Sequence, residues 1–116
     1  MSLRDEILGF DDTEYEEVTV KQWKNKKVLI RSITAGDRFD VVNKSMDKKD
    51  NIDITKLNMY TLIACVCDPE TKKPLFTQAD YEVLRGKNSG AIDTLLSTAN
   101  RLNGLDEIAK KLAEKN

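Results

Sequence analysis

The sequence predicts an α+β fold, in which a small N-terminal β-hairpin packs with a bundle of four to five helices. Residues 18–33 alternate apolar and polar side chains on either side of a polar segment at 24–27, which is typical of two strands joined by a turn. After residue 34, apolar residues recur three or four positions apart, which is typical of helices. Strands that precede the helices, instead of alternating with them, indicate an α+β chain.

The first 17 residues are predicted to form a short helix and an acidic linker. Leu3, Ile7 and Phe10 have helical spacing, and acidic residues stand in the first turn, where they favour a helix N-terminus. Residues 1–17 hold seven acids and one arginine, a net charge of −6, whereas residues 18–31 hold five bases and no acid. We expect these neighbouring segments to neutralise each other with little gain in stability.

Trp23 is the one tryptophan of the chain and precedes the tip of the predicted hairpin. An exposed indole at this position would be an interface anchor, because tryptophan is enriched at binding hot spots. Folding of the indole over the edge of the sheet is an equally good interpretation.

Two helices are predicted in the middle of the chain, at residues 35–46 and 54–67. Phe39, Val42 and Met46 recur at helical spacing and would form the apolar face of the first helix. The second helix is apolar on nearly all sides, which is typical of the central helix of a domain. It is expected to end before Pro69, because proline disfavours helix in the preceding residue.

Two further helices are predicted to begin at Thr77 and Ser89. Thr77 is followed three residues later by Asp80, which is the spacing of a capping box. The helix from Ser89 has the cleanest apolar stripe of the chain, formed by Ile92, Leu95, Leu96, Ala99 and Leu102. Gly104 follows as the glycine that ends this helix.

The last predicted helix is amphipathic, with Leu105, Ile108, Ala109 and Leu112 on one face. A helix of about three turns is marginal in isolation, so it must dock on something to be ordered. Its apolar face has three interpretations: contact with the core of its own domain, with a second copy, or with a partner.

We therefore expect a single domain over residues 1–116. Its parts are the helix and acidic linker at 1–17, the hairpin at 18–33, the helical part at 34–104, and a loosely docked C-terminal helix at 105–116.

Composition excludes several classes of function. The chain has no histidine, so it can hold neither a Ser-His-Asp triad nor a histidine-ligated metal. Its glycines are scattered, which is unlike a phosphate-binding loop, and Cys65 and Cys67 lack the further soft ligands that a metal site needs. We expect both thiols to be reduced, and we predict no catalytic, cofactor or metal site and no enzymatic activity.

Charge and hydropathy argue against nucleic-acid and membrane partners. The 19 basic and 20 acidic side chains give a formal charge of −1, which provides no basic field for nucleic acid. No apolar run approaches the ~20 residues that a membrane span requires. The N-terminus carries charges where a signal peptide has its apolar core, so we expect a cytosolic protein.

Several short motifs follow one another along residues 1–105. A valine-rich strand pair containing Trp23 leads into residues 31–36, Arg-Ser-Ile-Thr-Ala-Gly. An apolar helix then ends in an aspartate before residues 75–77, Leu-Phe-Thr, and residues 100–104, Asn-Arg-Leu-Asn-Gly, close the folded part. This order resembles the tail assembly chaperones of long-tailed phages and prophages. The lysine-rich hairpin tip and the paired cysteines depart from that pattern.

The resemblance implies a non-enzymatic helper in siphovirus tail assembly. Such proteins bind the tape measure protein and keep it soluble in the cytoplasm of the bacterial host, and they are absent from the mature virion. A frameshifted longer form would recruit the tail tube protein, and a homo-oligomer is compatible with this role. A holdase for helical segments needs an apolar groove or a spare amphipathic helix. The partner-binding candidates are Trp23, Leu105, Ile108 and Leu112.

Two other functions are weighed against this one. The chain could instead be a structural virion component, such as a head–tail connector or a tail terminator subunit, which would form rings. A small DNA-binding protein would use the basic hairpin at residues 21–31 as a β-ribbon, but the acidic N-terminal flank opposes that interpretation.

Overall fold

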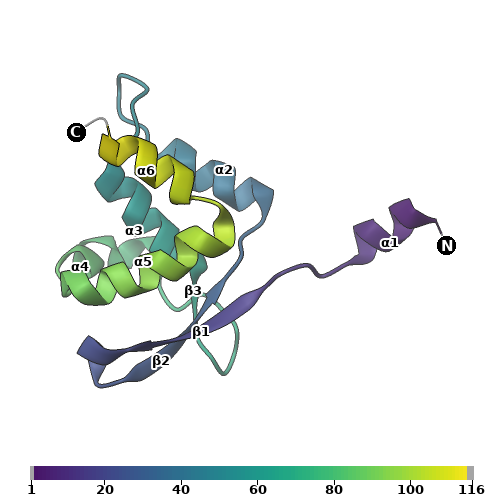
Figure 1. The fold of residues 1–116 in the computed structure, drawn as a ribbon, viewed down its shortest axis with the longest axis horizontal. Helices are drawn as coiled ribbons and strands as arrows, with labels where there is room; N and C mark the ends of the chain where they lie inside the picture. The colour runs from purple at the N-terminus through teal and green to yellow at the C-terminus, as the bar shows by residue number, and fades with distance from the viewer. Residues whose placement is uncertain (1, 115–116) are drawn as a thin grey trace.

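The computed structural model describes residues 2–114 of the chain and has six α-helices and three strands in these residues (Figure 1). In chain order they are α1 (Leu3–Gly9), β1 (Tyr15–Val20), β2 (Lys26–Arg31), α2 (Ala35–Lys44), α3 (Ile54–Cys65), β3 (Val66–Cys67), α4 (Tyr81–Arg85), α5 (Ser89–Asn103) and α6 (Asp106–Glu114). Short 3-10 turns lie at Lys21–Trp23 and Gln78–Asp80. The predicted α+β class with an N-terminal hairpin is confirmed.

The three strands form one antiparallel sheet with the order β1-β2-β3. Tyr15 stands opposite Arg31 and Val20 opposite Lys26, so β1 and β2 pair over their whole length. The prediction that the second central helix continues to residue 67 is wrong at its end. At Val66 the backbone becomes extended, and this residue pairs with Ile30 of β2. The free edge of β2 thereby gains a partner, and the β-branched Val66 suits a strand.

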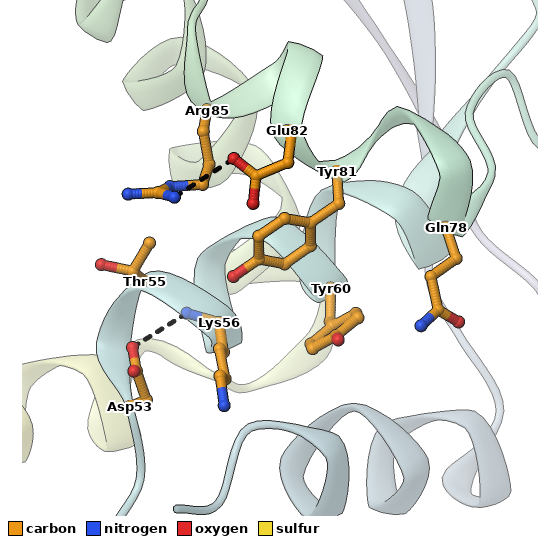
Figure 2. A pocket seen from close by; sticks show the side chains of 8 residues that line it. All are labelled: Asp53, Thr55, Lys56, Tyr60, Gln78, Tyr81, Glu82 and Arg85. Carbon is orange, nitrogen blue, oxygen red and sulfur yellow. Dashed lines mark hydrogen bonds and ion pairs between the residues drawn. The ribbon is translucent and has the colours of Figure 1, made fainter.

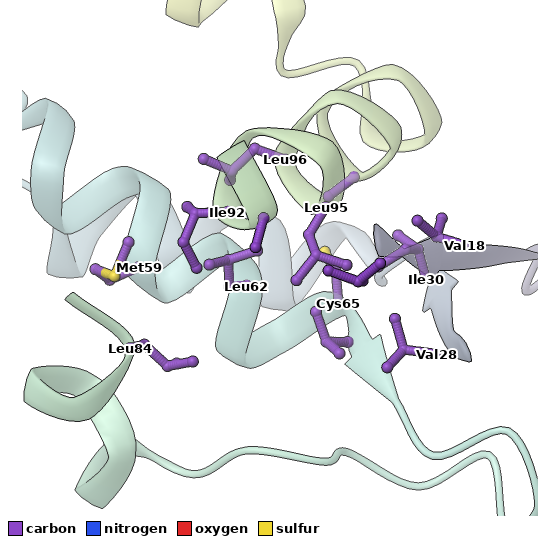
Figure 3. Close-up of a cluster of buried hydrophobic side chains, with 14 residues drawn as sticks. Val18, Val28, Ile30, Met59, Leu62, Cys65, Leu84, Ile92, Leu95 and Leu96 are labelled. Atoms are coloured by element: carbon purple, nitrogen blue, oxygen red, sulfur yellow. The ribbon is translucent and has the colours of Figure 1, made fainter. Parts of the chain in front are cut away.

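The core lies between the inner face of the sheet and the helices α3 and α5 (Figure 3). Val20 and Ile30 of the sheet, Leu62 of α3 and Leu95 of α5 are fully buried. The apolar stripe predicted on α5 is confirmed, since four of its five residues are buried and Leu102 is half-buried. Fully burying one such side chain stabilises the fold by roughly 1.5–3 kcal/mol.

Helix α2 packs on α3 with a different face from the one predicted. Phe39 is 69% exposed and Met46 is also exposed, whereas Val41 is buried. Ser45, one turn further on, is buried too, and its hydroxyl donates to the carbonyl of Val41 at 2.6 Å. A serine whose hydroxyl donates to a carbonyl of its own helix can lie on a buried face. A pattern of apolar residues alone does not identify such a position.

Side-chain caps begin most of the helices. At the start of α2, Thr34 accepts a hydrogen bond from the Asp37 amide at 3.0 Å. Helix α5 begins at Ser89, but the capping side chain is that of Asn88, which accepts from the Ala91 amide at 3.1 Å. Gly104 ends α5 in the left-handed conformation, with φ of 64°, which confirms its predicted role.

The N-terminal helix stands apart from the rest of the molecule (Figure 1). None of the residues of α1 is buried, and the connector to β1 carries it away from the sheet. Within residues 2–114, no helix combines the length and apolar composition that crossing a membrane would take.

Candidate functional site

The tip of the hairpin brings Trp23 over one end of the core. After Val20 the chain makes a 3-10 turn, and Lys24 and Asn25 then adopt positive φ angles of 55° and 60° before β2 begins. Asparagine tolerates this left-handed region better than most residues. The turn leaves the Trp23 indole half-buried against the core cluster, with part of its surface open.

The short helix α4 faces this indole. The 3-10 turn that leads into it is held by the predicted capping box, in which the Asp80 carboxylate accepts a hydrogen bond from the Thr77 amide at 2.8 Å. Leu84 of α4 points into the core and is buried, whereas Val83 is 61% exposed. The same helix thus anchors itself with one side chain and presents another to solvent.

A groove with a volume of about 470 Å³ lies between the hairpin tip and α4. This size falls in the ~300–1,000 Å³ range of concave binding sites. Six of its lining residues are apolar and three are charged: Trp23, Val28, Leu75, Phe76, Val83 and Leu84, with Lys26, Asp80 and Lys87. We call it the Trp23 groove. An apolar floor with few charges suits an apolar side chain or a helix face better than a polar small molecule.

A second cavity, of about 430 Å³, opens between α3 and α4 and is lined mainly by polar residues (Figure 2). Tyr60 and Tyr81 pack with ring centroids 5.3 Å apart, and burial raises the pKa of the Tyr81 phenol. Arg85 lies 3.2 Å from the Glu82 carboxylate, and Asp53 accepts from the Lys56 amide. Arg85 and Glu82 thus pair with each other, and the raised pKa of Tyr81 favours its neutral phenol.

The two cysteines are free and buried. Burial raises the pKa of the Cys65 thiol to about 12, and it raises that of Cys67 as well. The positive charge of Arg31 opposes both shifts without reversing them. A thiol that stays protonated and buried is a poor nucleophile and a poor metal ligand. In the described part of the chain, no three His, Cys, Asp or Glu side chains gather as metal ligands.

The residues predicted to bind a partner do not come together. Trp23 lines the groove at the hairpin tip, whereas Leu105 directly precedes α6 and Ile108 lies within it. Helix α6 lies across the other helices from the hairpin (Figure 1). Leu105 is only 1% exposed, so its side chain belongs to the fold of this chain. Ile108 is half-buried. Leu112 lies within α6, but its side chain is outside the described part of the structure.

Sequence reasoning missed most of the groove. Of the lining residues, the sequence predicts only Trp23 as a partner-binding residue, whereas Leu75 and Phe76 belong to the Leu-Phe-Thr motif, which by itself predicts no binding surface. These residues come from β2, the segment after β3, and α4, which are distant in sequence. Two features of the sequence point to the groove. Val83 is an apolar residue next to the core-facing Leu84, and Trp23 is the one tryptophan of the chain.

Comparison with known proteins supplies a likeness among solved structures. No model of a protein family matches the chain, and no curated protein matches it. Among solved structures, the chain is similar to one described as the structure of the bacteriophage HK97 tail assembly chaperone, with a TM-score of 0.63 and 21% identity. The likeness covers 88% of this chain and 95% of that chain. The chain therefore has the fold of that chaperone, as the order of its motifs led us to expect.

Proposed function

We propose that this chain is a tail assembly chaperone of a long-tailed phage or prophage. The single observation that carries the proposal is the shared fold, which extends over nearly the whole of both chains. The motif order along residues 1–105 supports it independently, because that resemblance uses the sequence alone.

In this role the chain binds the tape measure protein and keeps it soluble while the tail tube assembles. The client is a long helical chain with apolar stripes, which aggregate unless they are covered. The Trp23 groove offers an apolar surface of suitable kind, on which Val83 is exposed and the indole is half-buried. The chain performs no chemistry on the client.

The proposed site of action is the cytoplasm of the bacterial host, and the chain leaves before the virion is complete. A longer frameshifted form would carry an extension that recruits the tail tube protein. Both statements rest on the resemblance to the chaperone family.

Co-expression with the tape measure protein of the same phage tests this function. We expect the tape measure protein to move from the insoluble to the soluble fraction and to co-purify with this chain. Val83→Asp should reduce the co-purified amount at least tenfold, because it places a charge in the groove. Phe39→Asp is the matched control, since Phe39 is 69% exposed on α2 and lies outside the groove.

An unchanged solubility of the tape measure protein, with no co-purification, would refute the chaperone function. If the chain instead forms a stable ring of about six or more copies, a connector or tail terminator subunit becomes the better description. Equal losses in Val83→Asp and Phe39→Asp would show that the client does not use the groove.

A further inference from the structure

Both walls of the Trp23 groove are anchored to the rest of the fold. At the hairpin tip, the Gln22 side chain packs on the start of α5, so closely that a Cβ added at Gly90 would lie 2.8 Å from its amide nitrogen. On the opposite wall, Leu84 is 3% exposed and holds α4 on the core. A groove with anchored walls loses little conformational freedom when it is occupied, which favours binding.

The border of the groove is basic. Lys26 and Lys87 line it from β2 and from the segment after α4, and both are exposed. Neither lysine forms an ion pair with another described residue. Lys21 and Lys24, which flank Trp23 in the hairpin tip, are also exposed and without an ion pair in the described part of the chain. The two walls therefore carry four uncompensated positive charges.

The acidic side chains closest to this border have other partners. Asp80 is the one acid among the described lining residues, and its carboxylate accepts a hydrogen bond from the Thr77 amide at 2.8 Å. Glu82 of α4 pairs with Arg85 at 3.2 Å. No ion pair joins either carboxylate to the two lysines of the border. The groove thus combines an apolar floor with a positively charged border.

This combination selects a partner with the opposite arrangement of charge. Apolar side chains at positions i, i+3, i+4 and i+7 of a helix would fill the floor. Acidic side chains beside that stripe would lie opposite the lysines, whereas basic ones would place like charges together. The positive border also attracts acidic segments before contact and so speeds their association.

We propose that the Trp23 groove binds amphipathic helical segments whose apolar stripe is flanked by glutamate or aspartate, and that it discriminates against segments flanked by lysine or arginine. Trp23 and Val83 contact the apolar stripe, and Lys26 and Lys87 recognise the charge beside it. The inference rests on the proposed chaperone function, because it states which segments of the tape measure protein this chain covers.

Peptide binding followed by the fluorescence of Trp23 tests this selectivity, because Trp23 is the one tryptophan of the chain and is half-buried at the groove. The probes are two tryptophan-free, alanine-based peptides of about 18 residues, which is long enough to form a helix. Both carry leucine at positions i, i+3, i+4 and i+7, and they differ only in having glutamate or lysine beside the leucines.

The glutamate peptide should shift the indole emission to shorter wavelength, because it covers the indole. At about 0.05 M salt it should bind about tenfold more tightly than the lysine peptide. The difference between the two peptides should shrink toward equality at about 0.5 M salt, since the charges are exposed and become screened.

Reversal of the border charge is the decisive measurement. In Lys26→Glu/Lys87→Glu the preference should invert, so that the lysine peptide binds more tightly than the glutamate peptide. Lys48→Glu/Lys49→Glu changes the net charge equally at exposed residues between α2 and α3, and it should keep the wild-type preference. Both variants should retain the thermal transition of the wild type, because the altered side chains are exposed and form no ion pair with a described residue.

Co-purification with the tape measure protein separates this inference from the chaperone function. Lys26→Glu/Lys87→Glu should retain about fivefold less of the client than Lys48→Glu/Lys49→Glu. Equal affinity of the wild type for the two peptides, binding of neither peptide, or an unchanged preference after charge reversal would overturn the proposed selectivity. If the wild type still co-purifies with the tape measure protein in any of these cases, the chaperone function stands without it.

Discussion

The side-chain carbonyl of Asn103, at the end of α5, accepts a hydrogen bond from the backbone amide of Ile33 at 2.7 Å. The amide nitrogen of the same side chain donates to the Ala99 carbonyl at 2.9 Å, and to the Arg31 carbonyl and the Cys65 sulfur at 3.3 Å. One buried side chain thus joins the end of the sheet, the end of α3 and the last turn of α5. All of its hydrogen-bonding groups are used.

Asn103→Ala should lower the free energy of unfolding by about 1–3 kcal/mol, because it leaves the partly buried Ile33 amide without its partner. Asn103→Asp should also destabilise the fold, since it keeps the acceptor but loses the donor and buries a charge. Urea unfolding followed by circular dichroism measures both. Ser97→Ala, at an exposed position of α5, should change stability by less than about 0.5 kcal/mol. A loss below about 1 kcal/mol for Asn103→Ala would show that water replaces the carboxamide.

Gly104→Ala should destabilise the fold by about 1 kcal/mol. The cause is backbone strain, because the residue has φ of 64° while an added Cβ would meet no heavy atom within 4 Å. Gly104→Asn should cost less, since asparagine tolerates the left-handed region. Equal losses for the two variants in urea unfolding would contradict this explanation.

The thiols should react with a disulfide reagent at pH 8 only after unfolding. Burial raises the pKa of Cys65 to about 12 from its ordinary value of 9.0, so the folded chain holds the protonated form. As pH rises from 9 toward 12, the unfolded chain loses this proton first and folding stability falls, by up to ~1.4 kcal/mol per pH unit for one group. In Cys65→Ala, the free energy of unfolding should fall less steeply over this pH range. A thiol that reacts within seconds in the folded protein would contradict the inference that both thiols are buried and protonated.

Leu105→Ala should destabilise the fold by about 2–5 kcal/mol, because the side chain is 1% exposed and its truncation leaves a cavity. Ile108→Ala should cost less, since Ile108 is half-buried. Thermal unfolding of the two variants compares the two losses of stability. Ile108→Ala would show the larger loss if α6 were held mainly through Ile108.

Ile108→Asp tests the prediction that α6 contacts the tape measure protein. If α6 takes part, the variant should lose co-purified tape measure protein while keeping the wild-type unfolding transition. Val83→Asp provides the comparison, because it alters the groove and leaves α6 intact. Retention of the client by Ile108→Asp and loss by Val83→Asp would assign binding to the groove alone.

Local chemistry accounts for what the sequence predicted well. The stripe on α5 is regular and its caps are standard residue types, so the helix from Ser89 to Asn103 follows from spacing and capping. The hairpin follows from alternation around a polar turn. Phe39 shows the limit of this reasoning. Its spacing is helical, but the face of α2 that is buried depends on where α3 lies, and that face includes a serine.

The sequence by itself determined the α+β class, the order of the hairpin and the helices, and the absence of histidine chemistry, because these depend on composition and on contacts between near neighbours in the chain. Only the tertiary structure decided that Val66 leaves the helix to pair with Ile30, that Leu105 is buried, and that Trp23 and Val83 face one groove. Each of these depends on segments far apart in sequence. Their contacts arise from the packing of whole elements, which no local pattern encodes.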